Sequence, residues 1–225
     1  MKHQSLRLKR WVARRRHIEA PMSRLVNDPL PSPSEPFRNV DFVSLDIETT
    51  GLDAGTADML SVGWVLVRAG KVDLETAETY IVRPSGDVGD SASVHGLTDT
   101  MVESGHDWVV VLNKIIEILT GRVLLVHHAG LDKVLLDRMC RQVYGIRLLV
   151  PVVDTLVLEL RRQERRHHVN DRQSLKLGDL RSAYNLPRYG AHDCLVDAIA
   201  TAELMIAMVA HNDGPEKTRL GDLHG

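Results

Sequence analysis

The chain has 225 residues, 44% hydrophobic and 26% charged, which is the size and composition of one globular domain with a possible appendage. Its two cysteines and the lack of a C-x-x-C spacing exclude a disulfide framework and a zinc site of that pattern, so we expect a reducing, cytoplasmic location. The net charge of −2 is uneven: residues 1–40 hold nine Lys or Arg against three acids, a net of +6, and the rest holds 19 against 27, a net of −8.

Residues 1–39 are predicted to form a basic helix followed by a Pro-rich linker. The stretch RLKRWVARRRH suits either an amphipathic helix that docks on the domain or an arm that binds phosphate, and both readings stay open. The stretch NDPLPSPSEP is typical of an extended linker. The first thirty residues lack the apolar run of a secretion signal, and no uninterrupted apolar run is long enough to span a bilayer, so we expect no membrane association.

From residue 40 onward, apolar runs with the period of a strand alternate with runs that have the period of a helix. Three strands come first, and the Ala-Gly pair at 69–70 suits a tight connection between the second and the third. Helices and strands then alternate, and two helices follow. The expected strands are 40–50, two runs within 59–84, 122–128 and 149–155, and the expected helices are 106–121, 131–145, 156–166, 174–185 and 192–211.

This order predicts an α/β domain over residues 40–212, followed by a flexible C-terminal tail at 213–225. Aromatic residues make up only 4% of the chain, which favours strands packed against helices over an aromatic-rich sandwich. We expect a mixed five-stranded sheet. Its first three strands would be antiparallel, and its parallel strands would be joined by helices that flank the sheet.

Two acids, Asp46 and Glu48, interrupt the apolar run of the first strand in the stretch SLDIETTGL. Side chains two residues apart on a strand point to the same face, so these carboxylates lie close together and repel each other. A divalent cation bound by oxygen ligands would neutralise the pair. The alternative is an exposed edge strand with two solvated acids.

Two further acids stand where helices are expected to begin. Asp132 lies between the strand RVLLVHH and the next helix, and Asp197 lies in the first turns of the last helix, five residues after His192. Each of them alone is explained equally well as an acid that stabilises a helix N-terminus.

Three stretches in this order, FVSLDIETTGL, LLVHHAGLDKVLL and YGAHDCLVDA, resemble the three motifs of the DEDDh-type 3′–5′ exonucleases. This DnaQ-like group includes the proofreading epsilon subunit of the bacterial replicative polymerase. The stretches VHGLTD and VVDTLVLEL resemble two ancillary elements of the same family. The resemblance covers roughly residues 40–210 and implies a ribonuclease H-like fold, in agreement with the predicted order of strands and helices.

The resemblance also implies hydrolysis of a terminal phosphodiester with two divalent ions, Mg²⁺ or Mn²⁺. Asp46 would bridge the two ions, Glu48 and Asp197 would complete the tighter site, and Asp132 would hold the second ion. Carboxylates are the ligands that such hard ions prefer. His192 would act as the general base, because an imidazole suits proton transfer near neutral pH.

The residues that follow the first two acids are candidates for contact with the terminal nucleotide. In the family, the backbone and the apolar side chain that match Thr49, Thr50, Gly51 and Leu52 meet this nucleotide. A glycine turn lets main-chain N–H groups approach a sugar, and a leucine can wedge against a base. An ordinary turn at the end of a strand is the alternative.

The second motif departs from the family pattern, because His128 and Leu131 stand where the family usually has Asn and Phe. The usual residues position the terminal nucleotide, so these two replacements bear on substrate preference and turnover. We interpret His127 as a structural residue or as one that supports the metal ligands, and His95 as a residue that fixes a loop or, alternatively, lines the site. A basic cluster could track the nucleic-acid backbone or form a solvated loop; it contains Arg161, Arg162, Arg165, Arg166, His167, His168 and Arg172.

The sequence therefore predicts a 3′–5′ exonuclease of the proofreading-subunit type that releases nucleoside monophosphates from single-stranded DNA. Its implied partners are the 3′ end of a single strand, DNA rather than RNA, and a DNA polymerase, with a role in DNA replication or repair. One alternative is an exoribonuclease that trims RNA ends. Another is a catalytically weak module that binds nucleic acid or a polymerase. Oligomeric state stays open.

Overall fold

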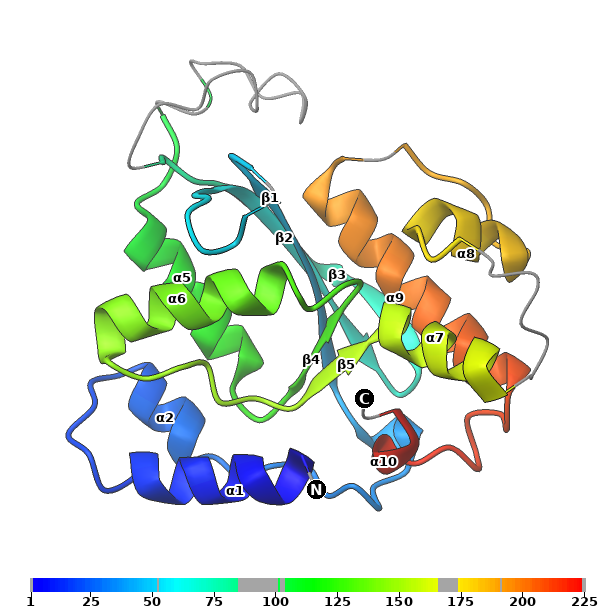
Figure 1. The fold of residues 1–225 in the computed structure, drawn as a ribbon, viewed down its shortest axis with the longest axis horizontal. Helices are drawn as coiled ribbons and strands as arrows, with labels where there is room; N and C mark the ends of the chain where they lie inside the picture. The colour runs from blue at the N-terminus through cyan, green and yellow to red at the C-terminus, as the bar shows by residue number, and fades with distance from the viewer. Residues whose placement is uncertain are drawn as a thin grey trace.

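The computed structural model describes residues 2–51, 53–84, 101, 104–165, 174–190 and 192–223. A five-stranded sheet in the order β3-β2-β1-β4-β5 forms its centre (Figure 1). β1 and β2 are antiparallel, as are β2 and β3, whereas β4 runs parallel to β1 and to β5. This arrangement confirms the predicted mixed sheet. The strands are β1 (Phe42–Thr49), β2 (Met59–Arg68), β3 (Lys71–Ile81), β4 (Val123–Val126) and β5 (Val152–Asp154).

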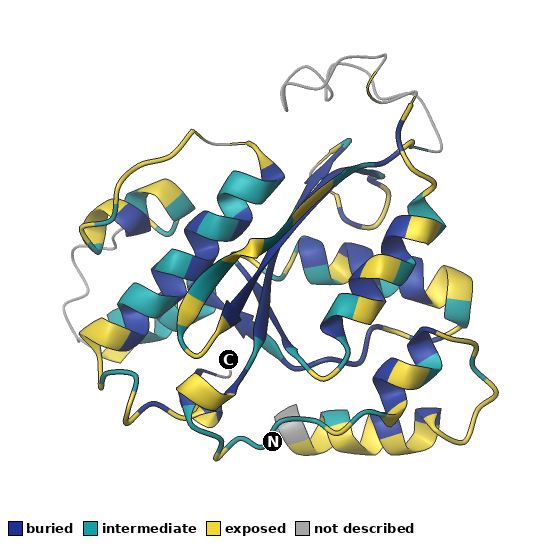
Figure 2. Cartoon of the chain, turned by 180° about the vertical axis from the view of Figure 1, so that it is seen from behind, coloured by how far each residue is buried: buried dark blue, intermediate teal, exposed yellow. Residues whose placement is uncertain are grey.

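Helices cover both faces of the sheet (Figure 1). One face carries α5 and α6 with the N-terminal helices beside them, and the other carries α7, α8 and α9. β1, β2 and β4 are buried over most of their length, whereas the edge strand β3 is partly exposed, as are the outer sides of the helices (Figure 2). The helices are α1 (Lys2–Ala13), α2 (Met22–Asn27), the short 3₁₀ helix η1 (Phe37–Asn39), α5 (Trp108–Leu119), α6 (Asp132–Tyr144), α7 (Thr155–Arg165), α8 (Leu177–Ala183), α9 (Cys194–His211) and α10 (Leu220–Leu223).

The alternation along β1 divides the hydrophobic core into two clusters. Val43, Leu45 and Ile47 pack in the cluster that contains α5 and α6, and Phe42 packs in the cluster that contains α9. Asp46 shares its face with Phe42, because strand residues separated by an even number point the same way. The acids of β1 therefore face α9.

Helix α9 lies on the sheet as a core helix. Its length and apolar composition alone would let it cross a membrane, and half of it is buried inside this structure. The Oγ of Ser44 donates a hydrogen bond of 2.6 Å to the carbonyl oxygen of Ala198, which ties β1 to the middle of the helix. These contacts give the apolar face of α9 an ordinary structural role.

Helix α1 is docked on the domain by a buried arginine. Arg10 is 4% exposed, and its guanidinium donates to the carbonyl oxygens of Val26 at 3.2 Å and Leu149 at 2.9 Å and to that of Leu25. Burial lowers the pKa of Arg10 to about 10. The Nε of Arg14 also donates to Val26, at 3.0 Å. Of the two roles left open for the basic helix, docking is thus directly visible.

The C-terminal segment differs from the predicted flexible tail. Leu220 and Leu223 are buried in the same cluster as Phe37. Backbone hydrogen bonds join this segment to the linker, from Leu220 N–H to the Glu35 carbonyl at 2.9 Å and from Gly221 N–H to the Pro33 carbonyl at 2.7 Å. The tail is ordered because its leucines complete an apolar cluster that the linker begins.

Candidate active site

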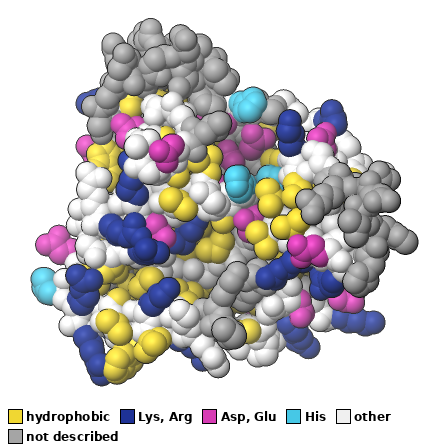
Figure 3. Space-filling model, in the orientation of Figure 1, with side chains coloured by type: hydrophobic (Ala, Val, Ile, Leu, Met, Phe, Trp, Pro, Cys, Tyr) yellow, Lys and Arg dark blue, Asp and Glu magenta, His cyan; other side chains and the backbone are white. Residues whose placement is uncertain are grey.

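Three of the four candidate metal ligands converge at one end of the sheet. Carboxylate oxygens of Asp46, Glu48 and Asp197 all lie within 4.8 Å of one another. Glu48 is buried, and the other two are partly exposed. Figure 3 shows acidic and histidine side chains gathered on this face near the end of β1 and the start of α9. The structure therefore places a concentrated negative charge where the sequence analysis expects a metal site.

The start of α9 determines where Asp197 lies. The side chain of Asp193 caps the helix, accepting hydrogen bonds from the backbone N–H groups of Leu195 at 3.0 Å and Val196 at 3.1 Å. Helical structure thus begins at Cys194 and sets Asp197 in the first turn. The Asp197 carboxylate accepts a hydrogen bond of 3.0 Å from the backbone N–H of His192. The candidate base and a candidate ligand are thereby joined.

Gly63 on β2 allows this approach of α9, and sequence reasoning did not single it out. It pairs directly opposite Asp46 in the antiparallel register. A Cβ atom at position 63 would lie only 2.4 Å from the backbone nitrogen of Leu195 and 2.6 Å from its Cα. The signal available in the sequence is a glycine inside a strand pattern, which often marks a close backbone approach.

Replacing Gly63 with Ala is expected to displace the start of α9, because a methyl group there overlaps helix backbone rather than a mobile side chain. A shift of about 1 Å in a catalytic group can cost roughly 10²-fold in rate. Overpacking of this kind typically costs about 1–3 kcal/mol of stability. Nuclease rates and thermal unfolding would measure both effects. Gly178→Ala is the matched control, since nothing lies within 4 Å of its added Cβ; equal rates for the two variants would contradict this role of Gly63.

Asp132, the fourth acid, lies beside the cluster at the first position of α6. It is 3% exposed, and its carboxylate accepts a backbone hydrogen bond from Ile47. β1 pairs with β4 only over residues 42–44, so the edge of β1 near Ile47 is left to this side chain. Asp132 lies outside the three-acid group but is the strongest charge partner of Asp46.

Burial and mutual repulsion raise the pKa values of three of these acids. Burial raises the pKa of Asp132 to about 8, and the carboxylates of Asp154 and Glu48 add to this. Burial also raises the pKa of Asp46 well above its ordinary value, with further increases from Asp132, Glu48 and Asp197. The pKa of Asp197 is raised by burial too. Proximity of this kind is expected of carboxylates that share a bound cation.

The donor set fits a hard divalent ion. None of the described residues forms an ion pair with Asp46 or Asp132, and the largest effects on the pKa of Asp46, burial and the neighbouring carboxylates, all raise it. Clustered carboxylate oxygens are the ligands that Mg²⁺ and Mn²⁺ prefer. Asp46, Glu48 and Asp197 could hold one such ion, with Asp132 available to a second.

Two histidines of the site have left-handed backbone conformations. The φ angles are 82° at His128 and 70° at His192, in a region that non-glycine residues seldom occupy. The His128 loop is held by Asp154, whose carboxylate accepts from the backbone N–H groups of His128 at 3.0 Å and Ala129 at 2.8 Å. Asp154 also accepts from the N–H of Leu156 at 3.0 Å. One carboxylate thus links the start of α7 to this loop.

The segment before His192 is fixed by a buried arginine that the sequence analysis did not identify. Arg181 is 1% exposed and donates to the carbonyl oxygens of Pro187 at 2.9 Å and Ala200 at 2.8 Å, and to the Glu203 carboxylate at 2.8 Å. Tyr189 packs over the guanidinium, 4.3 Å from its ring centroid. The chain leading to the candidate base is therefore anchored on α8 and α9.

His127 has structural contacts on both ring nitrogens. Its Nδ1 lies 2.7 Å from the hydroxyl of Thr155, and its Nε2 lies 2.9 Å from the carbonyl oxygen of Leu175. Burial lowers its pKa. These contacts support its interpretation as a structural residue.

The candidate nucleotide-binding residues are placed only in part. The hydroxyl of Thr49 donates to the carbonyl of Gly51 at 2.7 Å, and the hydroxyl of Thr50 accepts from the N–H of Asp58 at 2.9 Å. Leu131, partly buried, immediately precedes α6. Their contacts with a nucleotide stay predictions. Leu52, His95, Arg166, His167, His168 and Arg172 lie outside the described residues.

Comparisons with known proteins agree on one family. The exonuclease family model, RNase T, matches residues 43–205. The PolC-type DNA polymerase III of Caldanaerobacter subterraneus subsp. tengcongensis is 30% identical over 189 residues, covering 82% of this chain and 13% of that protein. The PolC-type enzyme of Thermotoga petrophila is 29% identical over 174 residues, covering 77% of this chain and 12% of that protein. The chain thus spans about an eighth of these relatives.

The fold is also found in a solved nuclease. The zinc-bound form of the E. coli exonuclease I complex with single-stranded DNA superimposes with a TM-score of 0.63 and 18% identity. The match covers 77% of this chain and 41% of that chain. At this identity the likeness concerns the fold.

Proposed function

The chain belongs to the exonuclease family, and on this basis we propose that it is a divalent-metal-dependent 3′–5′ exonuclease acting on single-stranded DNA. It would hydrolyse the terminal phosphodiester and release nucleoside monophosphates. The observation that carries the proposal is the convergence of Asp46, Glu48 and Asp197 within 4.8 Å, with Asp132 beside them.

The four acids would bind two ions, with Asp46 shared between them, Glu48 and Asp197 at one site and Asp132 at the other. When bound, the ions would stabilise the charge that develops on the reacting phosphate oxygens and make a water molecule more acidic. The imidazole of His192 would accept the proton of the attacking water. The hydrogen bond from its backbone N–H to the Asp197 carboxylate holds this residue at the acidic cluster.

The other candidate residues would orient the substrate. Thr49, Thr50, Gly51 and Leu52 would meet the terminal nucleotide, and His128 and Leu131 would take the places that Asn and Phe hold in the family. The sequence similarity to PolC-type DNA polymerases supports a DNA polymerase as a partner. The similar fold of E. coli exonuclease I, solved with single-stranded DNA, is consistent with DNA as the substrate.

A timed digestion of 3′-labelled and 5′-labelled strands tests the proposal. With Mg²⁺ or Mn²⁺, the 3′ label should be released in the first product, while the 5′-labelled strand shortens in single-nucleotide steps. A chelator should abolish both reactions, because it would remove the divalent ions that the four acids are proposed to bind and that the hydrolysis would require. Release of the 5′ label first, or undiminished activity with chelator, would contradict the proposal. A matched RNA strand separates deoxyribonuclease from ribonuclease activity.

A further inference from the structure

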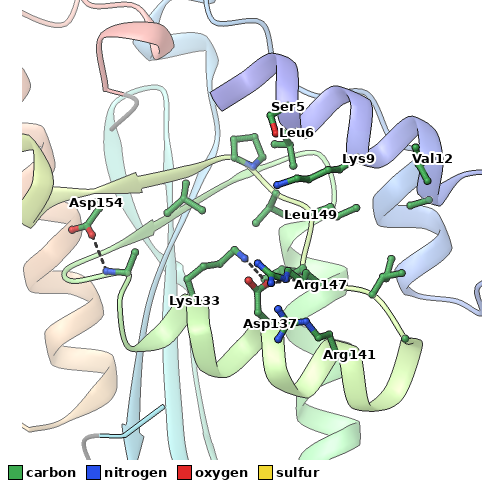
Figure 4. A pocket seen from close by; sticks show the side chains of 18 of the residues that line it. Ser5, Leu6, Lys9, Val12, Lys133, Asp137, Arg141, Arg147, Leu149 and Asp154 are labelled. Carbon is green, nitrogen blue, oxygen red and sulfur yellow. Dashed lines mark hydrogen bonds and ion pairs between the residues drawn. The ribbon is translucent and has the colours of Figure 1, made fainter. Parts of the chain in front are cut away.

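A large groove lies between the docked N-terminal helix and the domain. Its volume is about 1070 Å³, and it is lined by α1, α6, the segment 145–152 and the start of α7. Figure 4 shows Lys9 on α1 on one side of the groove. Arg147 of the segment 145–152 and Lys133, Asp137 and Arg141 of α6 lie on the other side. The groove is distinct from the acidic cluster, since none of the four candidate ligands lines it.

The lining of the groove carries an excess of positive charge. Its five cations are Lys9, Arg16, Lys133, Arg141 and Arg147, and its two acids are Asp137 and Asp154. Both acids have partners within the protein. The Asp137 carboxylate accepts hydrogen bonds from Lys133 and from the N–H of Leu148 at 3.0 Å, and Asp154 holds the His128 loop.

Three of the cations are left for a ligand. Among the described residues, no carboxylate forms an ion pair with Lys9, Arg141 or Arg147, and all three side chains are exposed. Residues 41–225 together carry a net charge of −8, so Arg141 and Arg147 form a basic patch on an otherwise acidic domain, next to the basic helix α1. The charge complements a polyanion.

The groove leads away from the acidic cluster. Helix α6 starts with Asp132, and Lys133, Asp137 and Arg141 follow at intervals of four residues along the face that lines the groove. The 13 residues of this helix span about 20 Å, the rise of roughly six stacked nucleotides. Ala129, in the loop between His128 and Leu131, lines the near end. Lys and Arg side chains gather over α6 and the N-terminal helices on the face that also carries the acids (Figure 3).

We propose that this groove binds the sugar-phosphate backbone of the single strand on the 5′ side of the terminal nucleotide. The inference rests on the proposed exonuclease function and adds a second contact region to it. Lys9, Arg141 and Arg147 attract the phosphates, and the apolar residues Leu6, Ile146 and Leu149 line the floor beside them. A strand long enough to reach the groove is therefore held more tightly than one that fills the acidic cluster alone. An acidic peptide would lack this continuity with the cleavage site.

Binding measurements on the full chain test the groove. In an Asp46→Asn background, fluorescence anisotropy would compare oligodeoxythymidines of about 4 and about 16 nucleotides. Arg141→Glu with Arg147→Glu should weaken binding of the longer strand by about 10-fold or more. It should also reduce the salt dependence, because each lost phosphate contact removes about 0.7 from the slope of log K against log salt. Lys71→Glu with Lys217→Glu, both exposed and outside the groove, is the control with the same charge change.

The outcomes separate this inference from the proposed function. The inference is supported if the groove variant loses the preference for the longer strand and the control keeps it. It is overturned if both double variants retain the preference and the salt slope. Hydrolysis of the longer strand by the unsubstituted protein is measured in parallel, and its failure would count against the exonuclease proposal whatever the groove does.

Discussion

Asp46→Asn is expected to lower the rate of phosphodiester hydrolysis by at least about 10³-fold while the protein stays folded. Asp46 lies in the centre of the site, within 4.8 Å of Glu48 and Asp197 and in strong electrostatic contact with Asp132. Asparagine keeps the shape of the side chain but removes the negative charge that would bind cations. The same change relieves repulsion among the acids, so thermal stability without metal should hold or increase.

Rates of nucleotide release and thermal unfolding, measured on the same preparations, check this expectation. Asp213→Asn serves as the control, because it makes the same chemical change at an exposed position outside the acidic group. An active Asp46→Asn protein would favour the catalytically weak binding module instead. Loss of activity together with loss of folding would show that Asp46 is needed for structure.

Asp132→Asn is expected to have two opposite effects, a loss of hydrolysis of about 10²-fold or more and a gain in stability at pH 8 without metal. Burial raises the pKa of Asp132 to about 8, from 3.8. Its folded-state pKa is thus above the unfolded value, so its contribution to stability is fully present below pH 4 and is lost as the pH rises to 8. One pKa unit corresponds to about 1.4 kcal/mol, and the loss amounts to a few kcal/mol.

Melting temperatures in chelator at pH 5 and pH 8 would measure this difference for the unsubstituted protein and for Asp132→Asn. The unsubstituted protein should lose more stability across this range, and added Mg²⁺ or Mn²⁺ should restore it, because a bound cation favours the ionised carboxylates. If both proteins change equally between the two pH values, the carboxylate of Asp132 is not the group responsible.

Most of the fold could be predicted from local sequence, because apolar residues recur at every second position in a strand and at every third or fourth position in a helix. The two-residue period of a strand also explains why Asp46 and Glu48 share a face. Their meeting with Asp197 could not be derived from spacing, since it depends on how α9 packs on β2, and it was inferred from the family motifs. The exonuclease family assignment confirms that resemblance.

The supporting residues were beyond local prediction for the same reason. Gly63 matters because of a contact with Leu195, and Arg181 matters because of the carbonyls of Pro187 and Ala200. A glycine inside a strand pattern signals a close approach at Gly63 without naming its partner, and the contacts of Arg181 leave no pattern in the neighbouring sequence. The packing of the C-terminal segment was not predicted, because Leu220 and Leu223 join an apolar cluster whose other members, such as Phe37 and Phe42, lie far away in the chain.

This pairing of the linker with the C-terminal segment changes what counts as the smallest stable unit. The residues around Pro33 and Gly221 form a seam that closes over the α9 side of the sheet, joined by backbone hydrogen bonds. Trimming the protein to residues 40–212 would open that seam and remove Phe37, Leu220 and Leu223 from the apolar cluster to which Phe42 and Val209 also belong. The linker and the C-terminal segment thus complete this part of the hydrophobic core together, and removing either one is expected to destabilise the domain.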